Sequence, residues 1–122
     1  MPSDYSTPII EMKNYIKRHC EARDWDQYHN PKDLAIGIIT ESSELLELFR
    51  FRNEAEMDLM LKDDEKRGKI CEELADVLFF TLRFAQLYDI DLTAEFYKKM
   101  KKNELHYPVE KAKGSNKKYD EI

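Results

Sequence analysis

The chain contains little glycine and proline: only three glycines and four prolines occur among its 122 residues. Both residue types are frequent in the tight turns that join short strands. Their scarcity argues against a turn-rich β protein and favours long helices joined by short connections. A chain of this length is expected to form one domain, residues 1–122, with residues 110–122 as a polar, flexible tail.

Cysteine is also scarce, since Cys20 and Cys71 are the only two and they form no CxxC motif. This argues against a cysteine-based metal or redox site and favours a reduced intracellular protein. No apolar run approaches the roughly 20 residues that cross a bilayer, and the N-terminus lacks the apolar core of a signal peptide. We therefore expect a soluble cytoplasmic protein without a membrane partner.

Charged residues, in contrast, are abundant at 37%, and the net charge is −5. The negative balance argues against binding of a nucleic acid polymer, but a small nucleotide remains acceptable if a cation lies between it and the protein. Eight lysines are concentrated between residues 98 and 118. Most are expected to line a solvated helix face, and one or two can face an anionic ligand.

Apolar spacing and capping signals predict an all-α fold with four main helices. The first begins after Pro8 with Thr7 as its N-cap, and the second runs from Pro31 to about Arg52 with Asn30 as its N-cap. The third covers about 66–88, and the fourth runs from Leu92, after an Asp91 cap, to His106. Residues 53–65 are expected to form a short helix or an ordered connection.

Acidic residues interrupt the apolar run ITESSELLELF at residues 39–49. Leu34, Ile38, Leu45 and Leu48 recur at the spacing of a buried helix face, and Glu41 occupies the middle of that stripe. Glu44 lies one turn further on and points the same way. Glu47 is rotated away from the stripe and is expected to be peripheral.

The run ICEELADVLFF at residues 70–80 repeats this arrangement. Glu73 and Asp76 lie beside the expected inward seam of the third helix, whereas Glu72 is turned towards solvent. The residues of that seam are Ile70, Leu74, Val77, Thr81, Phe84 and Tyr88.

Four inward carboxylates cannot stay ionised and unpaired in a low-dielectric site. A single ExxE is usually a solvated acidic face, but two such pairs on neighbouring long helices favour a shared cation. Ligands that are all oxygen select hard ions, so Mg²⁺ is the first expectation and Mn²⁺ the second. A di-iron bundle needs ExxH motifs, and neither pair supplies a histidine.

The two motifs, Glu41-Ser-Ser-Glu44 and Glu73-Leu-Ala-Asp76, resemble those of the MazG-like, all-α nucleoside triphosphate pyrophosphohydrolases. The chain is most similar to the dCTP pyrophosphatase branch of that family. The similarity also covers RDWDQYHNPKDL at 23–34 and KMKKNELHYPV at 99–109. Two positions depart from the pattern: Thr40 precedes Glu41 where much of the family has another glutamate, and Phe51 stands where the branch tends to carry tryptophan.

The resemblance implies a four-helix-bundle-like fold that assembles as a homodimer or homotetramer. It also implies Mg²⁺-dependent hydrolysis of a nucleoside triphosphate, dCTP or a related pyrimidine nucleotide, to the monophosphate and pyrophosphate. The implied metal ligands are Glu41, Glu44, Glu73 and Asp76. Glu41 is the expected general base, with Glu44 as the alternative.

Further residues match nucleotide-binding positions of the family, and each also has a plain structural explanation. Lys99 and Asn103 would bind phosphate or sugar, or else lie on an exposed helix face. Trp25 and Phe51 would form an aromatic wall for the base, with Trp25 supplied by the same chain or by the partner subunit, or else Phe51 would pack in the core. Phe80 would support the sugar or fill the core, and His29 would bind substrate or stabilise its loop. Two other functions stay open: a non-catalytic regulator that binds metal or nucleotide, and a helical interaction module.

Overall fold

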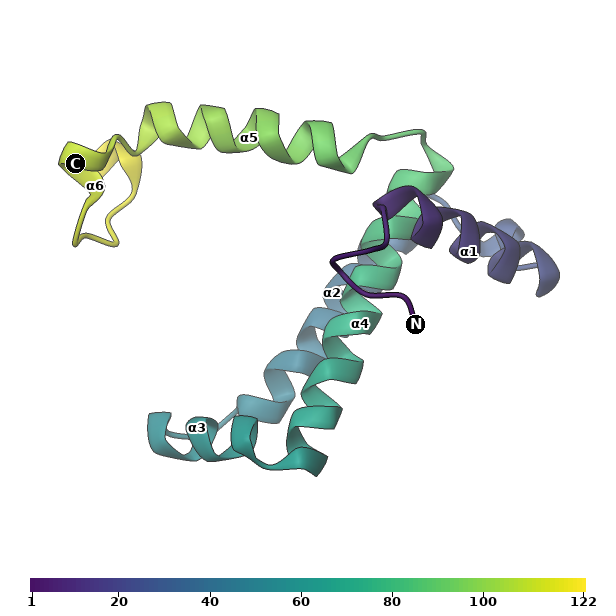
Figure 1. Cartoon of the computed structure of the whole chain (residues 1–122), viewed down its shortest axis with the longest axis horizontal. Coiled ribbons are helices and arrows are strands. Elements are labelled where there is room, and N and C mark those ends of the chain that lie inside the picture. The colour runs from purple at the N-terminus through teal and green to yellow at the C-terminus, as the bar shows by residue number, and fades with distance from the viewer. The chain divides into compact units, whose positions relative to one another are not determined.

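Helices account for all regular structure in the computed structural model, which describes all 122 residues and contains no strand (Figure 1). The all-α prediction is therefore confirmed. The chain forms two compact units, Met1–Asp89 and Ile90–Ile122. The prediction of a single domain stays a prediction. None of the helices is both long and apolar enough to cross a membrane.

The first unit contains four α-helices and one short 3-10 turn. These are α1 (Ile9–Ala22), η1 (Asp26–Tyr28), α2 (Pro31–Phe49), α3 (Glu54–Lys62) and α4 (Asp64–Leu87). The main contact is between α2 and α4, which lie side by side and run in opposite directions because α3 connects their neighbouring ends (Figure 1). α1 packs against α4 as well.

Side-chain caps mark where α2 and α3 begin. The Asn30 side chain accepts a hydrogen bond from the backbone N–H of Asp33 at 2.9 Å, and Pro31 occupies the first position of α2, as predicted. Asn53 and Glu56 form a reciprocal capping box at the start of α3. Each cap satisfies backbone donors that the first helical turn leaves unpaired, so the connections on either side of α3 can be short.

Two predicted helix ends are wrong. Pro8, not Thr7, is the N-cap of α1, and the Thr7 hydroxyl instead accepts from the Ser3 backbone N–H at 3.3 Å. α2 ends at Phe49 and not at Arg52, because Phe51 adopts the left-handed conformation with φ of 63°. That conformation is incompatible with continuation of a right-handed helix.

The predicted buried stripe of α2 is confirmed. Leu34 is completely buried, and Ile38, Leu45 and Leu48 are half-buried along the same face. Gly37 lies on this stripe directly against the ring of Phe80 on α4. A Cβ atom added at residue 37 would lie 2.8 Å from Cγ of Phe80, so the two helices approach too closely here for any side chain.

Gly37→Ala is therefore expected to destabilise the protein by about 1–3 kcal/mol, because Phe80 must leave its position to admit the methyl group. This loss should exceed the gain of about 1 kcal/mol that alanine normally brings to a helix interior. Urea unfolding followed by circular dichroism measures the difference. Gly68→Ala is the matched control: nothing lies within 4 Å of its Cβ position, so it should be neutral or stabilising. Equal effects of the two substitutions would contradict the close approach.

The predicted inward seam of the third helix is partly wrong. Leu74 and Tyr88 are 55% and 41% exposed, whereas the buried residues of α4 are Ile70, Leu82, Arg83 and Ala85. The reason is that α4 packs on α1 as well as on α2, so the buried face of its C-terminal half turns towards α1. Leu74 instead lines an open apolar hollow with Cys71 and Leu78.

The second unit contains α5 (Leu92–His106), a single helical turn α6 (Val109–Ala112) and the 3-10 turn η2 (Tyr119–Glu121). The Asp91 side chain accepts from the backbone N–H of Ala94 at 3.0 Å, so the predicted cap and the predicted limits of this helix are confirmed. The Tyr119 ring stacks on His106 with 4.2 Å between ring centroids.

Candidate active site

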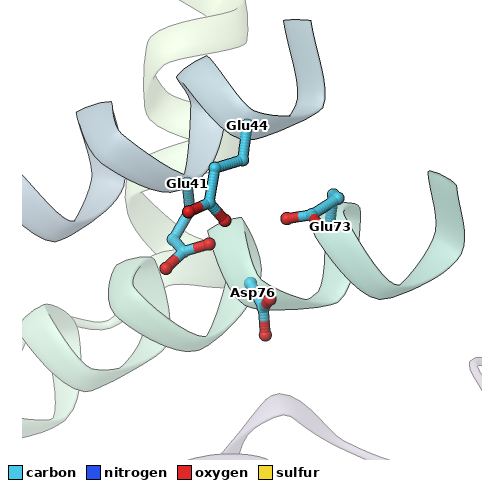
Figure 2. A group of neighbouring side chains, drawn as sticks. All are labelled: Glu41, Glu44, Glu73 and Asp76. Atoms are coloured by element: carbon cyan, nitrogen blue, oxygen red, sulfur yellow. The ribbon is translucent and has the colours of Figure 1, made fainter. Parts of the chain in front are cut away.

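The four predicted carboxylates come together between α2 and α4. Glu41 and Glu44 project from α2, and Glu73 and Asp76 project from α4 (Figure 2). One carboxylate oxygen of each residue lies within 4.8 Å of the others. This convergence follows from the local geometry: residues three apart lie on one face of a helix, and the two helices run antiparallel with these faces opposed.

No positive side chain of the first unit is paired with this cluster. The ion pairs there lie elsewhere: Lys17–Glu21, Arg50–Glu47, Arg52–Glu56 and Arg83–Asp26. Oε2 of Glu41 and Oε2 of Glu73 are buried and have no hydrogen-bond partner. An unsatisfied buried polar atom normally costs about 1–3 kcal/mol, so the cluster has unused capacity to accept a donor or a cation.

Crowding of like charges changes the acidity of the cluster. The pKa of Glu41 is raised to about 7, because it shares a hydrogen bond with Glu44, loses hydration by burial, and is repelled by the other three carboxylates. The pKa of Glu73 is also raised, by burial first and then by its hydrogen bond to Glu44; nearby Lys69 opposes this shift. Around neutral pH the metal-free cluster therefore holds protons that a bound cation would displace.

Phe51 and Phe80 occupy different environments. Phe51 is 89% exposed in the turn after α2, with the Arg50 guanidinium 4.7 Å from the centre of its ring. Its left-handed backbone is a strained conformation for a non-glycine residue, and such strain is concentrated at functional sites. Phe80 is half-buried against Gly37 and contacts Phe79 edge-on, which fits the core role that we considered for it.

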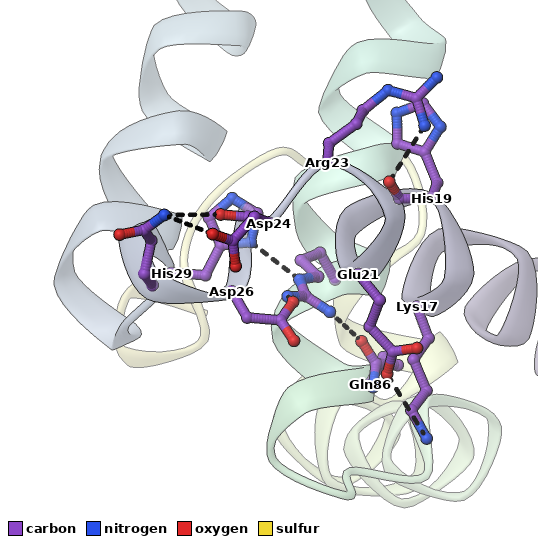
Figure 3. A network of polar contacts seen from close by, with 10 residues as sticks. Lys17, His19, Glu21, Arg23, Asp24, Asp26, His29 and Gln86 are labelled. Atoms are coloured by element: carbon purple, nitrogen blue, oxygen red, sulfur yellow. Dashed lines mark hydrogen bonds and ion pairs between the residues drawn. The ribbon is translucent and has the colours of Figure 1, made fainter.

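Trp25 and His29 lie at the two ends of η1. The Trp25 ring meets His19 edge-on with 5.4 Å between centroids. Nδ1 of His29 accepts a hydrogen bond from Nε of Arg83 at 2.8 Å (Figure 3). Sequence reasoning missed Arg83, although a lone arginine in the apolar stretch FFTLRFAQL at residues 79–87 is a usable signal, because a buried charge requires partners.

Lys99 and Asn103 lie one turn apart on α5, in the second unit. Lys99 is exposed and Asn103 is half-buried. Their roles in binding phosphate or sugar stay predictions.

Comparison with known proteins identifies relatives over most of the chain. The model of the MazG-like family matches residues 36–122. The chain is 35% identical to dCTP pyrophosphatase 1 of Rattus norvegicus and 34% identical to that of Homo sapiens, over 119 residues that cover 95% of this chain and 70% of each relative. The crystal structure of a pyrophosphatase from Archaeoglobus fulgidus matches with a TM-score of 0.77 at 32% identity, covering 88% of this chain and 99% of that one.

The fold and the cluster of carboxylates define an all-α protein with an acidic site between two antiparallel helices. The chain belongs to the MazG-like family. The prediction of this family is confirmed, and so is the predicted enzyme class, at the level of a hydrolase acting on nucleotides. The individual site residues and their roles stay predictions.

Proposed function

We propose that this protein is a Mg²⁺-dependent pyrophosphohydrolase that converts dCTP or a related pyrimidine nucleoside triphosphate to the monophosphate and pyrophosphate. The observation that carries the proposal is the convergence of four carboxylates, two of which have buried oxygens without a partner. The names of the relatives, dCTP pyrophosphatase 1, support the choice of substrate. We place the activity in the cytoplasm, where the free thiols of Cys20 and Cys71 would stay reduced.

The residues of the cluster fit a hard divalent cation. All four side chains offer carboxylate oxygen only, and neither sulfur nor imidazole lies among them. Oxygen-only ligation selects Mg²⁺, with Mn²⁺ as the alternative, and the missing histidines argue against redox iron. Glu41, Glu44, Glu73 and Asp76 would hold the ion, and the partnerless oxygens of Glu41 and Glu73 are free to bind it.

Mg²⁺ would supply the positive charge that lets a triphosphate approach four carboxylates, and it would make water more acidic. Glu41 would take the proton from the water that attacks the α-phosphorus in line with the leaving pyrophosphate. Glu44 is the alternative base.

The remaining residues would bind and orient the nucleotide. The exposed Phe51 ring and Trp25 would stack on the base, and His29 would donate or accept a hydrogen bond there. Lys99 and Asn103 would bind phosphate and sugar. Phe80 keeps α2 and α4 at close distance through its contact with Gly37, so it would act on the sugar only indirectly.

The proposed assembly is a homodimer or homotetramer formed through the helices. Its support is the open apolar hollow on α4, where Leu74 and Leu78 are exposed beside Cys71. Light scattering coupled to size-exclusion chromatography is expected to give two or four times the 14.6 kDa chain mass.

Pyrophosphate release from a panel of common deoxy- and ribonucleotides tests the function. With Mg²⁺, dCTP or a related pyrimidine nucleotide is expected to react fastest. EDTA should abolish release, because the triphosphate would then meet four carboxylates without a divalent cation between them. A regulator would bind nucleotide without releasing pyrophosphate. A helical interaction module would show no thermal stabilisation by Mg²⁺ with a non-hydrolysable analogue. Absence of pyrophosphate from every nucleotide would refute the proposal.

A further inference from the structure

Arg83 is a charged side chain with no solvent exposure, placed inside the apolar C-terminal half of α4. All three nitrogens of its guanidinium donate hydrogen bonds. Figure 3 labels the three partners, Asp26, His29 and Gln86. Nε donates to Nδ1 of His29 at 2.8 Å, Nη1 donates to Oε1 of Gln86 at 2.5 Å, and Nη2 donates to Oδ1 of Asp26, with which it forms an ion pair. A buried guanidinium is tolerable only when its donors are satisfied in this way.

The distant partners of Arg83 belong to the segment between α1 and α2. Asp26 and His29 are 57 and 54 residues away in sequence, whereas Gln86 is one turn further along α4. No side chain from residue 21 to residue 28 is buried, so this segment has no apolar core of its own. The two hydrogen bonds from Arg83 therefore help to fix its position on α4, together with the contact of the Trp25 ring with His19. Trp25 and His29, both expected to bind substrate, lie in the part that these bonds hold.

The bond to His29 also determines where its proton lies. Nδ1 accepts from Arg83, so it carries no hydrogen, and the neutral ring must carry its proton on Nε2. If Nδ1 were protonated, its N–H would face the Nε–H of Arg83, and the hydrogen bond between them would be lost. In agreement with this geometry, burial and the charge of Arg83 lower the pKa of His29, and Asp26 opposes the shift. No hydrogen bond within the first unit uses Nε2, so this atom is available as a donor.

We propose that Arg83 is a positioning residue: it holds the segment that carries Trp25 and His29, and it keeps His29 as a neutral donor whose Nε2–H binds an acceptor atom on the base of the nucleotide. Only the part of this inference that names the nucleotide as substrate rests on the proposed function. Arg83 follows Asp76 by seven residues, which is two turns, or about 10 Å of helix rise, along nearly the same face of α4. The base and the phosphates of one nucleotide would then be bound at separate points along this helix.

The first test reads the His29 tautomer in the wild-type protein by ¹⁵N-correlated NMR of the imidazole ring at neutral pH, without substrate. The expected signature is a neutral ring with the proton on Nε2. A proton on Nδ1, or a charged ring, would overturn the proposal. This measurement needs no variant and no activity, so it remains decisive even if substitutions at Arg83 prevent folding or the proposed function fails.

The second test uses Arg83→Gln, Arg83→Lys and His29→Ala with dCTP and Mg²⁺. Arg83→Gln is expected to raise KM about tenfold and to change kcat less than about twofold, because a base contact is lost while the carboxylates are untouched. Arg83→Lys should restore little of the lost substrate affinity, because an ammonium group cannot reproduce the planar arrangement of donors of the guanidinium. The double variant Arg83→Gln/His29→Ala should be worse than His29→Ala alone by less than the full effect of Arg83→Gln, because part of the Arg83 effect acts through His29.

Arg18→Gln, an exposed arginine on α1, is the matched control and should leave both constants unchanged. An unchanged KM in a folded Arg83→Gln variant would overturn the substrate role of Arg83 alone, provided that the wild type hydrolyses dCTP. If the wild type hydrolyses no nucleotide, the proposed function and this substrate role fall together. Fully additive effects in the double variant would likewise contradict action through His29.

Discussion

Replacing Glu44 by glutamine or Asp76 by asparagine is expected to lower the rate of pyrophosphate release about a hundredfold or more. Each substitution keeps the size of the side chain but removes one of the carboxylates that converge within 4.8 Å. Residues that only orient metal ligands already change affinity or activity by about 10–100-fold, so loss of a ligand should have at least the larger effect. Initial rates at saturating Mg²⁺ and several dCTP concentrations measure it.

Measuring the stability of the Glu44 and Asp76 variants distinguishes the loss of a metal ligand from unfolding. Removing one of four mutually repelling carboxylates should leave the melting temperature of the metal-free protein unchanged or higher, so activity falls while the fold persists. Glu47→Gln is the matched control on α2: Glu47 lies one turn after Glu44 but is exposed and paired with Arg50. It should keep nearly full activity. A Glu44 or Asp76 variant that retains more than about a tenth of the wild-type rate would contradict the assignment of these ligands.

The stability of the metal-free protein should carry a pH-dependent contribution from Glu41. Its pKa is raised from 4.5 to about 7 in the folded state, so the folded protein keeps a proton that the unfolded chain has already released. The contribution of this group is fully present below about pH 4.5 and is lost as the pH rises through about 7. Burial and the hydrogen bond to Glu44 raise the pKa of Glu73 as well, so Glu73 acts in the same direction.

Thermal unfolding of the wild type and of Glu41→Gln, between pH 5 and pH 8 in EDTA, isolates this contribution. The comparison is needed because the lowered pKa of His29 acts in the opposite direction: its neutral folded form favours stability as the pH rises. The difference in melting temperature, wild type minus Glu41→Gln, should decrease steadily across this range. A constant or increasing difference would contradict the raised pKa of Glu41.

Added Mg²⁺ should reverse the trend, because the ion binds the deprotonated carboxylates of the folded state and so stabilises most at the highest pH. At a hundred times its dissociation constant, a ligand of the folded state adds about 2.7 kcal/mol. The gain for Glu41→Gln should be clearly smaller. Equal stabilisation of wild type and variant at pH 8 would show that the ion binds elsewhere.

Local sequence signals predicted most of the fold correctly. Asn30 with Pro31 and Asp91 mark helix starts that the structure confirms, because a cap acts on backbone groups within three residues. The end of α2 was missed because a left-handed residue that ends a helix is usually glycine or asparagine, whereas residue 51 is phenylalanine. The exposure of Leu74 was missed because helical periodicity alone does not determine which of several neighbours covers a face.

By itself, the sequence determined the all-α class, the family and the two carboxylate pairs, because helical spacing places residues three apart on one face whatever surrounds the helix. Only the tertiary structure decided that the pairs meet, that Gly37 admits the Phe80 ring, and that Arg83 binds Asp26 and His29. These contacts join residues tens of positions apart. They depend on how the helices pack against one another, which periodicity along a single helix does not encode.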